Sequence, residues 1–186
     1  MRKILIAGGP CSGKTALVEE LARRSYYTVP EAALSVINNE ERAGSNIFPW
    51  TDFEEFNKRV IELQGQNEVV IPQETSLAIL DRSLVDPAAY FRRKDLPIPS
   101  YLDDMVREAH YEQAFILDML PKSYWDKTKG GMPRIMQTYE EGERIHWFIR
   151  TIYRNYGIKT TSIPFVSPIE TRVDLVESSL KDKTLG

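Results

Sequence analysis

Residues 8–15 read Gly8-Gly9-Pro10-Cys11-Ser12-Gly13-Lys14-Thr15 and match the pattern Gly-x-x-x-x-Gly-Lys-[Ser/Thr]. A short apolar run, residues 2–7 (RKILIA), precedes them, and residues 14–24 (KTALVEELARR) follow with apolar side chains spaced for one face of a helix. A strand, a glycine-bearing loop and a helix in this order are the setting in which the pattern binds phosphate. The sequence therefore predicts a P-loop at residues 8–15. An ordinary glycine turn with a solvated lysine is the alternative.

The chemistry of phosphate binding gives each part of this loop a role. Backbone N–H groups at the start of a helix point toward bound phosphates, where the helix dipole favours negative charge. Gly8 and Gly13 allow the turn, Lys14 reaches the β- and γ-phosphates, and the Thr15 hydroxyl ligates Mg²⁺. We therefore expect ATP (or GTP) with Mg²⁺. The expected nucleotide-binding residues are Gly8, Gly9, Pro10, Cys11, Ser12, Gly13, Lys14, Thr15 and Ala16.

Composition limits the function classes. The chain has 186 residues with 24 Lys and Arg against 27 Asp and Glu, a net charge of −3, and 42% hydrophobic residues. This balance is typical of a soluble globular protein with an ordinary core, and it argues against general binding of nucleic-acid polymers or anionic membranes. The longest N-terminal apolar stretch, Ile4–Ala7, is too short for a membrane span or a signal peptide, so a cytoplasmic protein is expected.

The chain has one cysteine, Cys11. A lone cysteine excludes an intramolecular disulfide and a multi-cysteine metal site. Its position inside the loop has two interpretations: a small side chain that the turn tolerates, or a thiol that makes nucleotide binding sensitive to oxidation.

Strand-like and helix-like segments alternate along the whole chain, which predicts a parallel sheet covered by helices on both faces. Two Thr-x-x-Glu capping boxes, at residues 51–54 and 138–141, mark helix starts. No linker divides the sequence, so one α/β domain over residues 1–186 is expected. The expected strands are 2–7, 26–29, 77–80, 114–117 and 159–163, and the expected helices are 14–24, 32–38, 51 to about 70, 87–93, 101–110, 138 to about 156, and one from 167.

Charged residues follow two of the expected strands. In open α/β sheets, ligands lie outside the carboxyl ends of the strands, so Glu31, Asp81 and Arg82 are candidates. Asp81 can meet Mg²⁺, Arg82 can hold a phosphate, and Glu31 can act as a general base for an acceptor hydroxyl. The alternatives are helix-capping carboxylates and a surface arginine.

A basic segment precedes the helix expected at 138–156. Residues 118–137 form the expected lid, because Gly130 and Gly131 supply flexible backbone and arginines stabilise a phosphoryl group in transfer. Arg134 is the first candidate for that role and Arg144 the second. A solvated loop with ordinary surface arginines is the alternative.

Five stretches together resemble one group of P-loop proteins, over nearly the whole chain. The stretches are residues 8–15 (GGPCSGKT), 29–33 (VPEAA), 81–90 (DRSLVDPAAY), 140–157 (EEGERIHWFIRTIYRNYG) and 163–176 (IPFVSPIETRVDLV). The group that they resemble is the P-loop ATPase and kinase family that includes the nicotinamide-riboside kinase domain of NadR and eukaryotic proteins linked to TRP-channel localisation.

The resemblance implies a P-loop kinase core with strand order 2-3-1-4-5 and an arginine-bearing lid. Glu31 resembles the glutamate that closes the second strand in deoxynucleoside-type kinases. Residues 81–83 look like their acidic-Arg-Ser element, which serves Mg²⁺ and phosphate, and residues 164–168 look like the resting place of the base. The chain departs from its relatives at Leu34, where they often carry Arg, and in the lid, which keeps Arg134 but loses two acids.

The favoured function is therefore a kinase-like phosphotransferase that moves the γ-phosphate of ATP to a hydroxyl of a small, nucleoside-like acceptor. One alternative is a nucleotide-dependent regulatory ATPase or GTPase that binds a protein or lipid partner. The other is a hydrolase whose acceptor is water. The acceptor, the choice of ATP or GTP, and the oligomeric state stay open at this stage.

Overall fold

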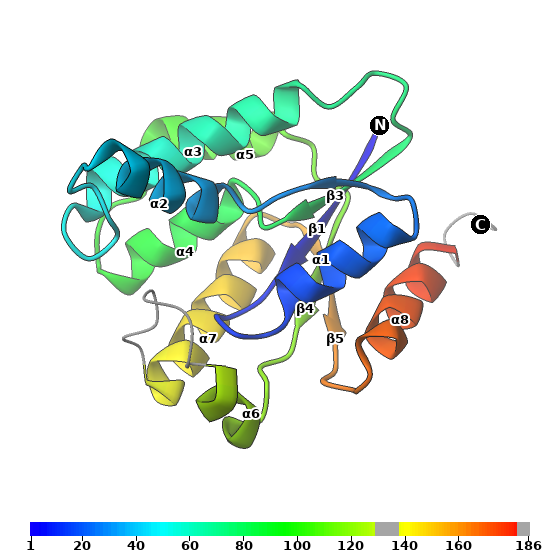
Figure 1. Cartoon of the computed structure of the whole chain (residues 1–186). Helices are drawn as coiled ribbons and strands as arrows, with labels where there is room; N and C mark the ends of the chain where they lie inside the picture. Colours follow the sequence, from blue (N-terminus) through cyan, green and yellow to red (C-terminus); the bar gives the residue numbers. More distant parts are fainter. Residues whose placement is uncertain (129–137, 182–186) are drawn as a thin grey trace.

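Five strands form one all-parallel sheet in the order β2-β3-β1-β4-β5 (Figure 1). The computed structural model describes residues 1–128 and 138–181. The predicted fold class, strand order and alternation of strands and helices are confirmed. Within the described ranges, no helix is both long enough and apolar enough to cross a membrane.

The elements follow one another along the chain in nearly strict alternation. The strands are β1 (Arg2–Ala7), β2 (Tyr27–Val29), β3 (Leu77–Asp81), β4 (Gln113–Leu117) and β5 (Lys159–Ile163). The helices are α1 (Lys14–Arg23), α2 (Ala32–Ala43), α3 (Phe53–Val69), α4 (Val85–Arg93), α5 (Ser100–Glu108), α6 (Lys122–Thr128), α7 (Tyr139–Asn155) and α8 (Ile169–Lys181).

The central strand β1 shows why both faces of the sheet are covered. Successive side chains of a strand point to opposite faces. Leu5 and Ala7 face a core built with α3, α4, α5 and α7, whereas Ile4 and Ile6 face a second core built with α1 and α8. Figure 1 shows α1 and α8 side by side, and the two helices are in contact. A strand buried on both faces reads as a continuous apolar run, which is why the sequence predicted it well.

The region between β2 and β3 differs from the prediction. Helix α2 continues to Ala43, five residues beyond the predicted end at Asn38, and ends at Gly44 with φ 65°. Glu40, which sequence polarity placed in a loop, is buried and pairs with Arg59 of α3. Burial against α3 therefore overrides local polarity, and α2 and α3 form a small apolar cluster of their own.

The predicted capping box at the start of α3 is wrong by one residue. The side chain of Asp52 accepts a hydrogen bond from the N–H of Glu55 and is the N-cap. The Thr51 hydroxyl instead accepts from the N–H of Phe48 in the preceding turn and donates to the Asn46 carbonyl. Both residues are good caps, and the preceding turn decides which of them is used.

The segment expected to be irregular contains helix α6. Trp125 of α6 is fully buried, and a Cβ built on Gly142 of α7 would lie 2.7 Å from its ring. The absent side chain at Gly142 thus makes room for the indole, which packs α6 against α7. Residues 129–137 of the expected lid lie outside the described residues.

The second predicted capping box is confirmed at the start of α7. Thr138 Oγ1 accepts from the Glu141 N–H at 3.1 Å, and Glu141 Oε2 accepts from the Thr138 N–H at 3.0 Å. We expect Thr138→Ala to lower the free energy of unfolding by about 1 kcal/mol in urea denaturation, because a helix donor loses its acceptor. Thr138→Ser keeps the oxygen and is the control. Equal stability of the alanine variant and the wild type would contradict the capping role.

Candidate active site

The loop at residues 8–13 joins β1 to α1 at the carboxyl end of the sheet, as predicted. Gly8 has φ 141°, and a Cβ built there would lie 2.7 Å from the Leu117 carbonyl of β4. Gly13 has φ 84° and is the N-cap of α1. Both positions therefore require glycine, the first because β4 passes close by and the second because the backbone is left-handed.

The Lys14 side chain is buried against this loop. It is only 5% exposed, and its Nζ donates to the Gly9 carbonyl at 2.8 Å and to Ser12 Oγ at 3.4 Å. Burial, together with the positive charge of Arg82, lowers the pKa of Lys14 to about 8. The alternative of a solvated lysine in an ordinary turn is therefore wrong. Burying an ammonium group is costly unless a counter-charge pairs with it, so a bound anion would stabilise Lys14.

Thr15 and Asp81 meet across the end of the sheet. The register that pairs Ile6 of β1 with Asp81 of β3 brings the ends of these two strands to the same level. The Thr15 hydroxyl donates to Asp81 Oδ2 at 3.1 Å, while the buried Oδ1 has no hydrogen-bond partner in residues 1–128 and 138–181. Burial, followed by the negative charge of Glu31, raises the pKa of Asp81 to about 6.

This pair fits Mg²⁺. A hydroxyl and a carboxylate are hard oxygen donors, and Mg²⁺ usually takes one or two such ligands together with phosphates and water. No group of three or more His, Cys, Asp or Glu side chains suited to a metal occurs in the described part of the chain. Thr15 and Asp81 are the residues that would hold such an ion.

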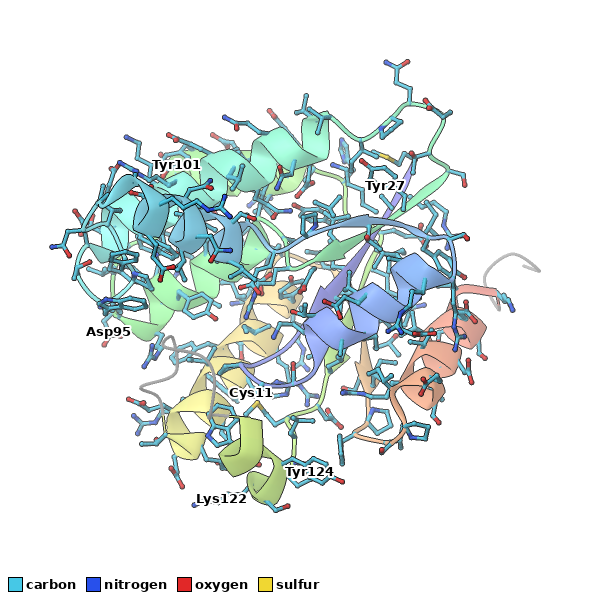
Figure 2. All side chains as sticks on the ribbon, in the orientation of Figure 1. Cys11, Tyr27, Asp95, Tyr101, Lys122 and Tyr124 are labelled. Atoms are coloured by element: carbon cyan, nitrogen blue, oxygen red, sulfur yellow. The ribbon has the colours of Figure 1, made fainter. Side chains whose placement is uncertain are left out.

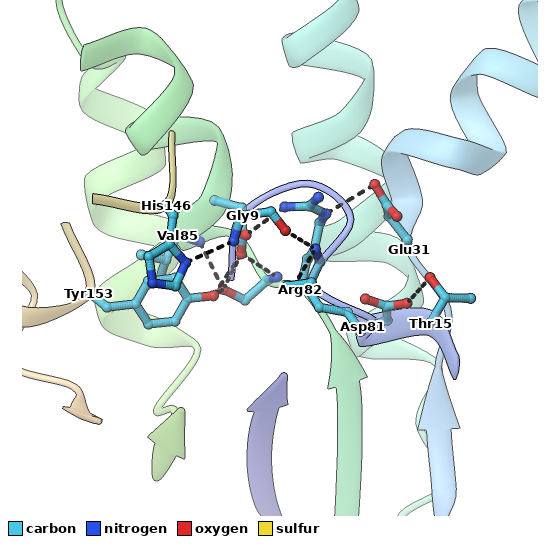
Figure 3. A network of polar contacts seen from close by, with 12 residues as sticks. Gly9, Thr15, Glu31, Asp81, Arg82, Val85, His146 and Tyr153 are labelled. Atoms are coloured by element: carbon cyan, nitrogen blue, oxygen red, sulfur yellow. Dashed lines mark hydrogen bonds and ion pairs between the residues drawn. The ribbon is translucent and has the colours of Figure 1, made fainter. Parts of the chain in front are cut away.

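Arg82 is fixed between two carboxylates (Figure 3). Its Nε donates to Glu31 Oε1 at 3.0 Å and its Nη1 donates to Asp86 Oδ1 at 3.1 Å. The backbone of Arg82 has φ 72°, a strained conformation for a residue other than glycine. Such strain persists where surrounding structure over-determines it, often at functional sites. The Glu31 side chain makes no cap hydrogen bond to α2, so the capping alternative for Glu31 is wrong.

Tyr153 is a member of the site that the sequence did not reveal. Its hydroxyl donates to Asp86 Oδ2 at 2.6 Å and lies 2.8 Å from Ser83 Oγ. Asp86 also accepts from the Ser83 N–H at 3.0 Å. Tyr153 lies on α7 among buried isoleucines, and only the contact of α7 with α4 brings its hydroxyl to Asp86. Through Asp86 it holds Arg82 in place.

His146 supports the first turn of the P-loop. Its Nδ1 accepts from the Gly9 N–H at 3.2 Å, and a Cβ on Gly9 would lie 3.0 Å from the His146 Cβ. Accepting through Nδ1 requires a neutral ring with its proton on Nε2. The isolated histidine carried no signal in the sequence, because its partner is a backbone group 137 residues away.

The remaining predicted site residues differ in exposure, and one of them lies outside the described residues. Arg144 lies exposed on α7, and Arg134 lies outside the described residues. Cys11 is half-buried, with φ 53°, on the loop between β1 and α1 (Figure 2). Pro10 is also half-buried, whereas Ala16 is exposed in the first turn of α1.

A buried lysine in a glycine loop at a helix start, with a threonine–aspartate pair beside it, defines a P-loop nucleotide-binding protein. Residues 3–172 match the model of the AAA domain family, so the chain belongs to that family. No curated protein matches the sequence.

Solved structures of similar fold include deoxyadenosine kinase from M. mycoides, with a TM-score of 0.70 and 15% identity over 97% of this chain and 98% of that chain. Thymidylate kinase from Ehrlichia chaffeensis is similar with a TM-score of 0.67 and 17% identity over 96% of this chain and 98% of that one. The YorR protein of Bacillus subtilis has a TM-score of 0.60 and 15% identity over 98% of each chain. The fold is therefore that of P-loop kinases.

Replacing Tyr153 with Phe tests the anchor of Asp86. We expect the free energy of unfolding to fall by roughly 1–3 kcal/mol, because a buried carboxylate loses a hydrogen-bond donor. Tyr156→Phe is a matched control, since it removes the hydroxyl that donates to the half-buried Asp103. Equal losses in the two variants, measured by urea denaturation, would argue against a special role for the buried contact.

The titration of His146 tests its contact with Gly9. Burial and the positive charges of Arg150 and Lys14 lower the pKa of His146 from 6.5, against an opposing effect of Asp118. We expect NMR of the single-histidine variant His110→Gln to show a His146 pKa below 6.5.

The stability consequence has a defined sign. A depressed pKa means that the unfolded chain binds the proton more tightly, so the free energy of unfolding decreases as pH falls below about 6.5. His146→Gln should reduce this dependence. A titration of His146 at or above 6.5 would exclude the neutral acceptor.

Proposed function

We propose that this protein is a kinase that transfers the γ-phosphoryl group of ATP (or GTP) to a hydroxyl of a small, nucleoside-like acceptor. The observation that carries the proposal is Arg82, strained and held between Glu31 and Asp86, directly beside the Thr15–Asp81 pair. A site that only holds a nucleotide needs the loop and the metal ligands. A fixed arginine and a carboxylate at the neighbouring strand end add a place for an acceptor.

Lys14 and the N–H groups of the loop bind the phosphates of the donor. Lys14 has two contacts within its own loop, so one of its three donors stays available to a phosphate oxygen. Mg²⁺, when bound by Thr15 and Asp81, would neutralise charge on the phosphates. Oδ1 of Asp81 has no hydrogen-bond partner among the described residues, which supports this assignment, because an ion would satisfy it.

Glu31 is the proposed general base. Its carboxylate takes the proton of the acceptor hydroxyl as the acceptor oxygen forms a bond to the γ-phosphorus. The bond from the γ-phosphorus to its bridging oxygen breaks, and that oxygen leaves on the nucleoside diphosphate. The ion pair with Arg82 holds the Glu31 carboxylate in place at the end of the sheet.

Arg82 is proposed to stabilise the negative charge of the phosphoryl group in transfer. An arginine aimed by two carboxylates needs no rearrangement at the moment of reaction, which is the basis of electrostatic preorganisation. Arg134 is proposed as a second cation, as the sequence pattern suggests. Arg144 is the weaker candidate, since its side chain is exposed.

The acceptor class is inferred from the kinases of similar fold. They are a deoxyadenosine kinase bound to dCMP and dCDP, a thymidylate kinase, and YorR bound to phosphorylated GDP. All three names point to nucleosides or nucleotides. The finer resemblance to the group that contains the NadR kinase domain supports the same acceptor class. Leu34, where the relatives often carry Arg, argues against nicotinamide riboside itself as the acceptor.

A panel of nucleosides and small alcohols with MgATP tests the activity directly. We expect at least one nucleoside to be phosphorylated, with ADP formed in equal amount, because the transfer consumes one donor for each acceptor. The measurement is product detection by mass spectrometry alongside ADP release. ATP binding with no phosphorylated acceptor across the panel, or ADP release independent of acceptor, would reject the kinase.

Glu31→Gln tests the base. We expect phosphoryl transfer to fall at least about a hundredfold while the affinity for MgATP stays within about threefold, because the amide cannot take the proton. Glu112→Gln is the matched control: it breaks another Arg–Glu pair, to Arg2, at the opposite end of the sheet. Unchanged transfer rates in Glu31→Gln would exclude the base role.

A further inference from the structure

Arg172 is a buried cation behind the P-loop. It lies on α8 and is 2% exposed. Its Nη1 donates to the Ser12 carbonyl at 2.8 Å and its Nη2 to the Ile163 carbonyl at 3.5 Å, while its Nε has no partner in the described residues. The buried guanidinium thus donates to two backbone carbonyls, and one of them, that of Ser12, belongs to the P-loop.

No carboxylate pairs with this guanidinium. Within residues 1–128 and 138–181, Arg172 makes no ion pair, whereas Arg82, the half-buried arginine of the site, pairs with both Glu31 and Asp86. Burial lowers the pKa of Arg172, and only the more distant Asp118 opposes this effect. A guanidinium nevertheless stays protonated, so an unbalanced positive charge is buried here. Such a charge is costly unless an anion compensates it.

The contact with Ser12 also orients the loop. A trans peptide is planar, and its C=O and N–H point in opposite directions. Because Arg172 holds the Ser12 carbonyl, the N–H of the same peptide, that of Gly13, points away from Arg172. Among the described residues no group accepts a hydrogen bond from this N–H. Arg172 Nη1 would lie 3.1 Å from a Cβ on Gly13, so the cation is immediately behind this peptide.

We propose that Arg172 is a positioning residue for nucleotide binding. It turns the Ser12–Gly13 peptide so that the Gly13 N–H meets a phosphate, and the nucleotide phosphates supply the missing counter-charge. The donation to the Ser12 carbonyl also polarises the peptide and strengthens its N–H as a donor. The inference rests on the nucleotide-binding half of the proposed function and is independent of phosphoryl transfer.

The charge of the ligand distinguishes this role from simple packing. If Arg172 acts through phosphate, its removal weakens binding of ATP more than ADP, and leaves adenosine unchanged. If Arg172 only packs α8 against the sheet, its removal disturbs the regions that hold the base and the phosphates alike, and all three ligands lose affinity together. The comparison uses binding alone, so a failed kinase assay leaves it intact.

Two variants separate charge from hydrogen bonding. Arg172→Gln keeps one donor for the Ser12 carbonyl and removes the charge, whereas Arg172→Lys keeps the charge. We expect Arg172→Gln to bind MgATP about tenfold or more weakly, with a smaller loss for MgADP, and Arg172→Lys to stay within about threefold of the wild type in calorimetry. The thermal midpoint of ligand-free Arg172→Gln should equal or exceed that of the wild type, because an unbalanced buried charge is gone.

Arg24→Met is the matched control. Arg24 also contacts α8, but it pairs with Asp174 and Glu177. We expect this variant to keep the ratio of ATP to adenosine affinity. Equal losses of ATP and adenosine in Arg172→Gln, or equal ATP affinity in Arg172→Gln and Arg172→Lys, would overturn the proposal.

A measurement on the wild-type chain covers the case in which the variants do not fold. In ¹H–¹⁵N NMR spectra, the Gly13 amide proton should shift downfield on addition of MgADP, because it gains a phosphate acceptor. Adenosine should leave it in place. A Gly13 amide that is unmoved by MgADP would overturn the proposal without any substitution.

Discussion

The ion pairs of Arg82 join the parts of the molecule that must act together. Glu31 follows β2 and is the N-cap residue of α2, and Asp86 lies in α4. Tyr153, which donates to Asp86, lies in α7. An arginine held by two carboxylates is stable only while all three stay in place, because side chains that are only 3–13% exposed leave any one of the three poorly solvated when its partners are removed. The strained backbone of Arg82 is retained by this network.

The sheet order supplies the geometry that the network uses. With β1 between β3 and β4, the loop after β1 lies beside the ends of both neighbours. Asp81 at the end of β3 accepts a hydrogen bond from Thr15. The Leu117 carbonyl of β4 lies so close to Gly8 that only glycine fits there. A parallel sheet thus collects at one edge the charged groups that its strands carry at their carboxyl ends. Lys14 and Arg172 are buried cations in contact with this loop, and a bound polyanion would compensate their charge.

The sequence predicted the strands well because β1, β3 and β4 are buried on both faces and read as apolar runs. It predicted Lys14, Thr15, Asp81, Arg82 and Glu31 as site residues because each follows a strand or a glycine loop. It was wrong about residues 39–43 and the first capping box, where packing of α2 on α3 and a preceding turn decide the outcome. Local polarity cannot report a partner that is distant in the chain.

By itself, the sequence determined the P-loop, the parallel α/β class and the kinds of charged groups at the strand ends, because these depend on short-range pattern and backbone chemistry. Only the tertiary structure decided which groups meet. Tyr153 on Asp86, His146 on Gly9 and Arg172 on Ser12 are separated by 67, 137 and 160 residues. Their contacts arise from helices α7 and α8 packing against the sheet, and no spacing in the chain encodes that approach.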